Sequence, residues 1–313
     1  MDRQRARHPH VFNVGLGTAT IEDTGLGLIP AHFALGAIRL WHTHFHQEEC
    51  RMAYDAVQTF LARCDRDAAR LRQARPLAPD VLAKIRDHLR VALTYGSNAI
   101  EGNTLTLQET AVVLEGQTVG GKPLRDHLEA VDHAAAFDFI WDLAVRHEPL
   151  TAHNVRTIHA LVTRNTLSQG SGAWRTVGVR ITASPHQPPD AIHVPSLMEA
   201  WVQQCTQPLR GEHPLVRAAR LHADFVSIHP FLDGNGHTAR LLTNLDLIRC
   251  GYVPALLLPQ DRLAYYQALD ATRRGSWEPL IQHFALAVHR SFEQFWLPYL
   301  GPAPERSRGG PVL

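Results

Sequence analysis

The chain has 313 residues and a mass of 34.9 kDa, which is enough for one large domain or two small ones. Hydrophobic residues make up 45% of it, an ordinary content for a protein with a sizeable core. The 31 basic and 30 acidic side chains nearly balance, so no basic field indicates nucleic acid, and no 18-residue apolar stretch indicates a membrane span. The first ten residues do not resemble a signal peptide, and the four cysteines lack zinc-site or disulfide spacing. We therefore expect a cytoplasmic protein with no nucleic-acid or membrane partner.

Residues 1–89 are predicted to form an N-terminal region in which a short β-hairpin precedes helices. The apolar residues of the first 28 positions lack a helical period, whereas from Pro30 onward they recur at helical spacing. Asp80 opens a helix with a single apolar stripe. We expect this helix to continue into the next segment.

Residues 90–104 contain Ser97, Glu101 and Gly102. Ser97 and Glu101 are four positions apart and therefore share one face of a helix, which Gly102 is expected to end. Taken alone, the pattern is most simply an ordinary helix end with a solvated glutamate.

Residues 105–298 are predicted to form the main helical domain. A capping box at residues 106–109 begins one of its helices, and Pro195 and Pro214 begin two others. Histidines in these helices are most simply surface residues or satisfied core residues. Residues 299–313 are rich in proline, glycine and arginine, and we expect a disordered tail.

Helical periodicity disappears in the residues that precede Pro195. Residues 174–181 alternate as a β-strand does, residues 186–189 turn the chain, and residues 192–194 can return it. The pattern predicts a β-hairpin of about twenty residues. An exposed hairpin edge can pair with an extended peptide through backbone hydrogen bonds.

Residues 229–240, His-Pro-Phe-Leu-Asp-Gly-Asn-Gly-His-Thr-Ala-Arg, place a base and a carboxylate beside a glycine turn that opens an apolar helix. Gly234 and Gly236 permit backbone conformations in which amide N–H groups converge on an anion. Asp233 is the hard oxygen ligand that Mg²⁺ prefers when it also binds substrate phosphates. His229 can accept a proton from a hydroxyl group. Together these neighbours predict phosphoryl or nucleotidyl transfer.

The same stretch resembles the signature of the Fic (Fido) domain family, His-x-Phe-x-(Asp/Glu)-Gly-Asn-Gly-Arg-x-x-Arg. One position departs from it, because the first arginine of the pattern is His237 here. The matching residues are His229, Phe231, Asp233, Gly234, Asn235, Gly236 and Arg240. In addition, Ser97-x-x-x-Glu101-Gly102 resembles the inhibitory motif (Ser/Thr)-x-x-x-Glu-(Gly/Asn) of many Fic proteins.

The resemblance implies a mainly α fold, namely a Fic-type helical bundle with one β-hairpin flap and an added helical N-terminal part. It also implies transfer of AMP from ATP to a Ser, Thr or Tyr hydroxyl of a target protein, with Mg²⁺ or Mn²⁺ and with self-modification. In that case His229 is the base, Asp233 holds the metal ion, and Arg240 contacts the terminal phosphates. The other implied site residues are Gly234, Asn235, Gly236 and His237 for the phosphates, Tyr265 and Tyr266 for the adenine, and Val177, Gly178, Val179, Arg180 and Ile181 for the target-binding flap.

The resemblance further implies autoinhibition. In the family the glutamate of the inhibitory motif pairs with the second arginine of the signature. Glu101 is therefore expected to hold Arg240 and to repel a γ-phosphate. Because both motifs lie in one chain, inhibition is expected to be intramolecular, with residues 90–104 acting on a catalytic core of residues 105–298. Helical surfaces also allow a homodimer, but no interface can be read from the sequence.

Several alternatives stay open at this point. Replacing arginine by His237 removes a permanent charge and a bidentate fork, which predicts weak or pH-dependent use of ATP or a preference for another nucleotide. The chain could instead remove AMP from a modified protein with Glu101 positioning water, or be a binding module without activity. A metallohydrolase is the last alternative, although the glycine turn interrupts the helical spacing of its ligands. Those ligands would be His222, His229, Asp233 and His237.

Overall fold

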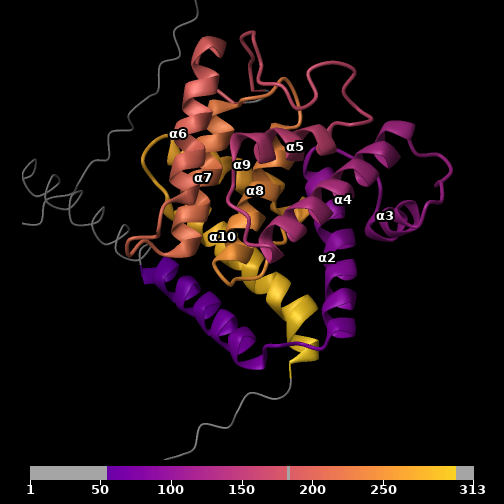
Figure 1. Cartoon of the computed structure of the whole chain (residues 1–313), viewed down its shortest axis with the longest axis vertical. Coiled ribbons are helices and arrows are strands. Elements are labelled where there is room, and N and C mark those ends of the chain that lie inside the picture. Colours follow the sequence, from indigo (N-terminus) through magenta and orange to yellow (C-terminus); the bar gives the residue numbers. More distant parts are fainter. Residues whose placement is uncertain (1–54, 182–183, 301–313) are drawn as a thin grey trace, which may run out of the picture. The chain divides into compact units, whose positions relative to one another are not determined.

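The structure, a computed structural model, describes residues 55–181 and 184–300, and their fold is helical (Figure 1). A first helix covers residues 55–74. The α-helices that follow are α2 (Pro79–Ile100), α3 (Leu107–Leu114), α4 (Leu124–Val145), α5 (Ala152–Val162), α6 (Val194–Thr206), α7 (Pro214–Ile228), α8 (Asn235–Arg249), α9 (Arg262–Thr272) and α10 (Glu278–Ser291). Short 3-10 helices are η1 (Ala191–His193), η2 (Pro259–Asp261) and η4 (Leu297–Tyr299), and the π-helical segment η3 (Phe292–Trp296) continues α10. The predicted mainly α fold is confirmed.

Local sequence signals explain where several helices begin. Thr106 caps α3 by accepting the N–H of Glu109, whose side chain in turn accepts the N–H of Thr106, as the capping box predicts. Proline occupies the first turn of α2, α6 and α7, where its missing N–H costs no helical hydrogen bond. None of the described helices is both long enough and apolar enough to cross a membrane.

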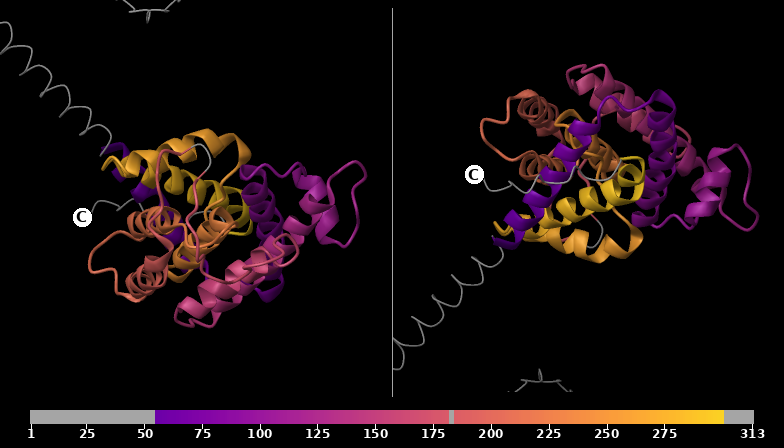
Figure 2. Two further views of the ribbon diagram at one scale, coloured as in Figure 1. Left: turned by 90° about the horizontal axis from the view of Figure 1, so that it is seen from above. Right: turned by 90° about the horizontal axis from the view of Figure 1, so that it is seen from below.

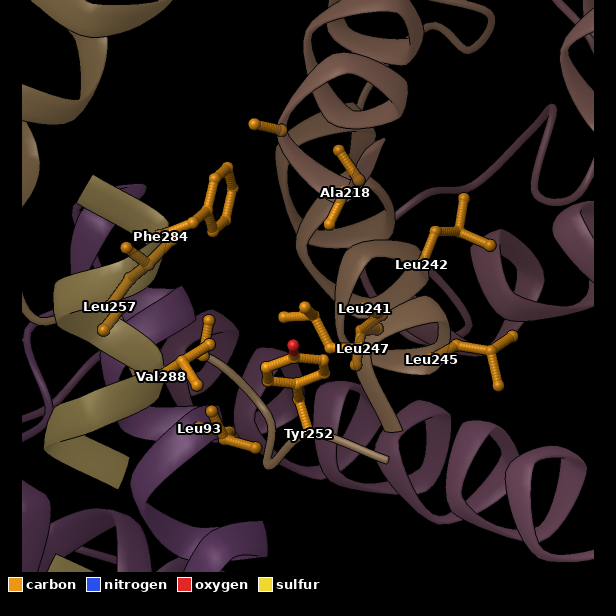
Figure 3. Packing of buried hydrophobic residues seen from close by; sticks show 14 of the residues in the cluster. Leu93, Ala218, Leu241, Leu242, Leu245, Leu247, Tyr252, Leu257, Phe284 and Val288 are labelled. Atoms are coloured by element: carbon orange, nitrogen blue, oxygen red, sulfur yellow. The ribbon is translucent and has the colours of Figure 1, made fainter. Parts of the chain in front are cut away.

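α8 is the central helix of the bundle and packs against α4, α5 and α7. It has leucines on more than one face, as expected for a helix enclosed by others. Figure 3 shows these leucines together with residues of the neighbouring helices. The buried leucines of α8 are Leu241, Leu242, Leu245 and Leu247. Because α8 is fixed on several sides, its first turn is a rigid base for a binding site.

The helix of residues 55–74 shares the core of the main domain. Its buried residues Val57, Leu61 and Leu71 belong to the same hydrophobic cluster as the leucines of α8. Figure 2 shows this helix, in indigo, beside α10. The hairpin predicted in the first 28 residues lies outside the described residues, and so do residues 301–313 of the tail predicted at 299–313. Tyr299, at the start of that predicted tail, instead belongs to η4. The domain boundaries at residues 89 and 104 stay predictions.

α2 approaches the rest of the bundle closely at Gly96. A Cβ atom there would overlap the carbonyl oxygen of Leu257, so only glycine allows this contact between α2 and the segment after α8. The close approach brings the last turn of α2, which carries Ser97 and Glu101, to the N-terminal half of α8.

The predicted β-hairpin between α5 and α6 is not seen in the described residues. Residues 174–181 and 184–190 contain no strand, and the predicted returning strand at 192–194 is wrong, because these residues form part of η1 and the start of α6. Prolines explain part of this result, since a proline has no N–H to donate to a strand ladder. The prolines of the segment are Pro185, Pro188 and Pro189.

Candidate active site

The loop between α7 and α8 is shaped by the side chain of Asn235. Its Oδ1 accepts the N–H of Phe231 at 3.0 Å, and its Nδ2 donates to the carbonyl of the same residue at 2.9 Å. Both polar ends of this buried side chain are therefore used inside the loop. Asn235 was predicted to contact phosphate, but in this structure it holds the turn together.

His159 of α5 supports the same loop, and the sequence analysis did not single it out. Its ring stacks on Phe231 with 3.6 Å between the centroids and 2° between the planes. Nε2 donates to the carbonyl of Asp233 at 2.9 Å, and Nδ1 accepts the N–H of Gly172 at 2.9 Å. Burial lowers the pKa of His159 to about 4, so the ring is neutral, as one donor and one acceptor require.

Gly234 and Gly236 are both needed at the start of α8. Gly234 has a φ of 72°, and a Cβ there would lie 2.8 Å from Cγ2 of Thr163. A Cβ on Gly236 would overlap the carboxylate of Glu101. The N–H groups in the first turn of a helix have no intrahelical partner and favour an anion, so a carboxylate lies where a phosphate would be stabilised.

His229 caps the C-terminus of α7 in the left-handed conformation, with a φ of 51°. Its Nδ1 lies 3.3 Å from the carbonyl of Val226 and donates to it, which leaves the lone pair on Nε2. Burial is the main cause that lowers the pKa of His229 below its usual value. The ring is therefore neutral at physiological pH and can accept a proton at Nε2.

Arg240 is brought together with the predicted inhibitory residues. Nη1 lies 2.8 Å from Oε1 of Glu101, Nε donates to Oγ of Ser97 at 2.9 Å, and Nη2 donates to the carbonyl of Ser97 at 3.1 Å. The arginine is 5% exposed, whereas the glutamate side chain is 35% exposed. Gly102, with a φ of 101°, follows the end of α2.

His237 turns its Nδ1 toward the same cluster. Nδ1 lies 2.9 Å from Oγ of Ser97 and 3.2 Å from Nη2 of Arg240, and it accepts from both. Burial, followed by the charges of Arg240 and Arg125, lowers the pKa of His237 well below its usual value. The ring is neutral, so its titration does not favour the predicted pH dependence of ATP use near neutrality.

Asp233 is the most exposed acidic group of the loop, with 64% of its side chain exposed. Oδ1 accepts the N–H of Gly234 at 2.7 Å, and Oδ2 lies 3.6 Å from Nη2 of Arg125. Among residues 55–181 and 184–300, no group of three His, Cys, Asp or Glu side chains could hold a metal ion. One exposed carboxylate nevertheless suits Mg²⁺ that is also bound by substrate phosphates and water.

The metallohydrolase alternative does not fit these contacts. His222 is buried, with Nδ1 bonded to Oγ1 of Thr243 at 2.8 Å and Nε2 bonded to the hydroxyl of Tyr265 at 2.7 Å. Neither nitrogen is free to bind a metal ion. Tyr265 is itself a core residue, so of the two predicted adenine contacts only Tyr266, which is partly exposed, lies at the surface.

Arg175 anchors the segment predicted as the flap, and it too was missed by the sequence analysis. It is 2% exposed, and its guanidinium donates to carbonyl groups of the loop and of the segment. Nε donates to His229 at 2.8 Å and Nη1 to Val177 at 3.0 Å, while Nη2 donates to Pro189 at 2.5 Å. Arg175 therefore fixes the start of residues 177–181 beside the loop between α7 and α8, although these residues form no strand.

Comparisons with known proteins agree with this arrangement. Residues 149–247 match the model of the Fic/DOC family. The chain is 34% identical over 206 residues to protein adenylyltransferase Fic from Nematostella vectensis, covering 64% of this chain and 47% of that protein. It is 32% identical over 205 residues to protein adenylyltransferase fic-1 from Caenorhabditis elegans, covering 64% and 40%. The chain thus matches less than half the length of these curated relatives.

The fold is also similar to solved Fic structures. A Fic domain containing signaling protein from Bacteroides thetaiotaomicron has a TM-score of 0.68 and 25% identity, covering 78% of this chain and 100% of that one. A fragment of Fic-1 from C. elegans has a TM-score of 0.68 and 26% identity, covering 85% and 77%. Residues 149–247 of this chain thus match the Fic/DOC family, as residues 229–240 predict.

Proposed function

We propose that this chain is an autoinhibited protein adenylyltransferase that moves AMP from ATP to a Ser, Thr or Tyr hydroxyl of a target protein. The observation that carries the proposal is the ion pair between Arg240 and Glu101, which lies beside the glycine turn that follows a neutral His229. The names of the curated relatives support the same activity.

In the proposed reaction the hydroxyl oxygen of the target attacks the α-phosphorus of ATP. The bond from that phosphorus to the oxygen bridging to the β-phosphate breaks, and pyrophosphate leaves. Nε2 of His229 takes the hydroxyl proton, because Nδ1 already donates to Val226. N–H groups in the first turn of α8 stabilise charge on the α-phosphoryl oxygens. Mg²⁺ or Mn²⁺, held by Asp233, would neutralise charge on the polyphosphate.

The position of the Glu101 carboxylate supports the proposed autoinhibition. It pairs with the cation that is proposed to bind the terminal phosphates, and it lies against Gly236 at the anion-binding turn. Two negative groups cannot share this turn, so ATP binds productively only when Glu101 is displaced. Glu101 is the C-terminal cap of α2, where a small change of the helix end would move it.

The test uses labelled ATP with Mg²⁺ and purified wild type, Glu101→Gly, His229→Ala and the double variant. Self-labelling is expected to rise in Glu101→Gly and to disappear whenever His229 is replaced. Glu115→Gly is a matched control, because Glu115 caps α3 and also precedes a glycine with positive φ. It is expected to label like the wild type.

Other outcomes would point to the alternatives. Release of AMP from a modified protein by the wild type, but not by Glu101→Gly, would favour the reverse reaction. ATP binding without transfer in every form would contradict the proposal and leave a binding module. Labelling from another nucleoside triphosphate, but not from ATP, would revise the substrate.

A further inference from the structure

We propose that Arg125, in the first turn of α4, binds the polyphosphate of the nucleotide and supplies the positive charge that is missing at position 237. The inference rests on the proposed function. The family pattern has an arginine where this chain has His237. The structure shows that His237 does not replace it, because the ring is neutral and its Nδ1 accepts from Ser97 and Arg240.

Arg125 lies close to the predicted metal ligand. Its Nη2 is 3.6 Å from Oδ2 of Asp233, and 63% of its side chain is exposed. Its charge is also among the causes that lower the pKa of His237. The guanidinium therefore lies near both the carboxylate proposed to hold the metal ion and the position of the missing arginine.

Glu129 orients the Arg125 side chain and is itself bonded to Asn103. Its Nε donates to Oε1 of Glu129 at 2.7 Å, and Oε2 of Glu129 accepts from Nδ2 of Asn103 at 2.9 Å. Glu129 is one helical turn after Arg125, and Asn103 directly follows Gly102 of the inhibitory motif. The guanidinium is thus held at Nε by Glu129, while Nη2 reaches toward the catalytic loop.

The ion pair between Arg125 and Asp233 can break when a nucleotide binds, so that each side chain takes a new partner. Both side chains are largely exposed and the two atoms are 3.6 Å apart, so the pair itself contributes little stability. In the proposed function Asp233 would hold the metal ion, and Arg125 would then be free to bind the phosphates. A guanidinium matches two phosphate oxygens at once and keeps its charge at any physiological pH.

The test measures binding of adenosine, AMP, ADP and ATP by calorimetry, with all variants made in the Glu101→Gly background. Arg125→Gln is expected to weaken ADP and ATP binding about tenfold, the loss of one charge-assisted contact, and to leave AMP and adenosine within twofold. Arg125→Lys should retain part of the affinity. The matched control is Arg146→Gln, which removes an exposed arginine at the opposite end of α4.

A second variant tests the replacement itself. His237→Arg restores the arginine of the family pattern, so it is expected to recover most of the ATP affinity lost in Arg125→Gln. In the Glu101→Gly protein that retains Arg125, His237→Arg is expected to raise the ATP affinity by a smaller factor. This non-additivity in a double-mutant cycle distinguishes a shared role from two separate ones.

The outcomes separate the two proposals. ATP binding that is unchanged by Arg125→Gln would overturn this inference and leave the proposed function standing. Strictly additive effects of the two substitutions would also overturn it, because Arg125 would then not replace the missing arginine. If no form binds ATP, the proposed function and the inference both fail.

Discussion

At the scale of single residues, two left-handed conformations make the turn that carries the site. His229 ends α7 with a φ of 51°, and Gly234 precedes α8 with a φ of 72°. Between them Phe231 is buried against His159 and Trp174. His229 and the glycine turn at Gly234 are thus fixed by the same short loop, and a change at either end should disturb both.

Gly234→Ala is expected to destabilise the fold by about 2 kcal/mol and to reduce labelling strongly. The reasons are the left-handed backbone and a Cβ that would lie 2.8 Å from Cγ2 of Thr163. Urea unfolding and the labelling assay measure the two effects. Gly120→Ala is the control, because a Cβ there meets nothing within 4 Å. Equal effects of the two substitutions would contradict this account.

At the scale of elements, one buried arginine links the segment after α5 to the catalytic loop. Arg175 donates to Val177 and Pro189 within the segment and to His229 in the loop. Its own N–H donates to the carbonyl of Pro230 at 2.9 Å. A target bound along the segment would therefore be positioned relative to the base.

Arg175→Lys is expected to loosen the segment without changing ATP affinity. Lysine keeps the charge but lacks the planar fork, so it cannot donate to three carbonyl groups in the same geometry. Amide hydrogen exchange at residues 176–181 should become faster, and the rate of transfer to a target should fall. Arg180→Lys, on the exposed part of the same segment, is the control for the hydrogen-exchange measurement. Unchanged exchange in Arg175→Lys would show that other contacts hold the segment.

At the scale of the whole molecule, buried neutral histidines make the fold sensitive to acid. Burial lowers the pKa of His159 to about 4 and that of His222 to about 3. An unfolded chain binds a proton at each of these residues near pH 6.5, whereas the folded chain does not until the lower pKa is reached. Their contribution to the free energy of unfolding is therefore full above pH 6.5 and is lost as the pH falls toward 4 for His159 and toward 3 for His222.

His159→Gln is expected to be less destabilising at pH 5 than at pH 7. The stabilisation that depends on a neutral His159 amounts to about 3 kcal/mol at most, and part of it has already gone at pH 5. Urea unfolding of both proteins at the two pH values measures the difference. His153→Gln, on an exposed face of the same helix, is the control. A destabilisation by His159→Gln that is the same at both pH values would refute the assignment.

Local signals in the sequence predicted the fold class, the helix starts and the central loop, because caps, prolines and glycine turns act through near neighbours. The contacts that were missed join distant positions. His159 is 74 residues from Asp233, and Arg175 is 54 residues from His229. Likewise, the burial of Tyr265 depends on α7. The prolines that oppose the hairpin, in contrast, were visible in the sequence. One signal in the sequence could have singled out Arg125. A cation in the first turn of a helix is unfavourable, because it opposes the helix dipole, and its presence there therefore suggests a functional role.

The contact between Glu101 and Arg240 also sets how the protein would respond to its surroundings. Under the proposed function, the apparent affinity for ATP is the affinity of the released form multiplied by the fraction of molecules in that form. If about one molecule in a hundred is released, binding is about a hundredfold weaker, and a partner that holds only the released form can restore it. The end of α2 would then determine the nucleotide concentration at which the protein responds.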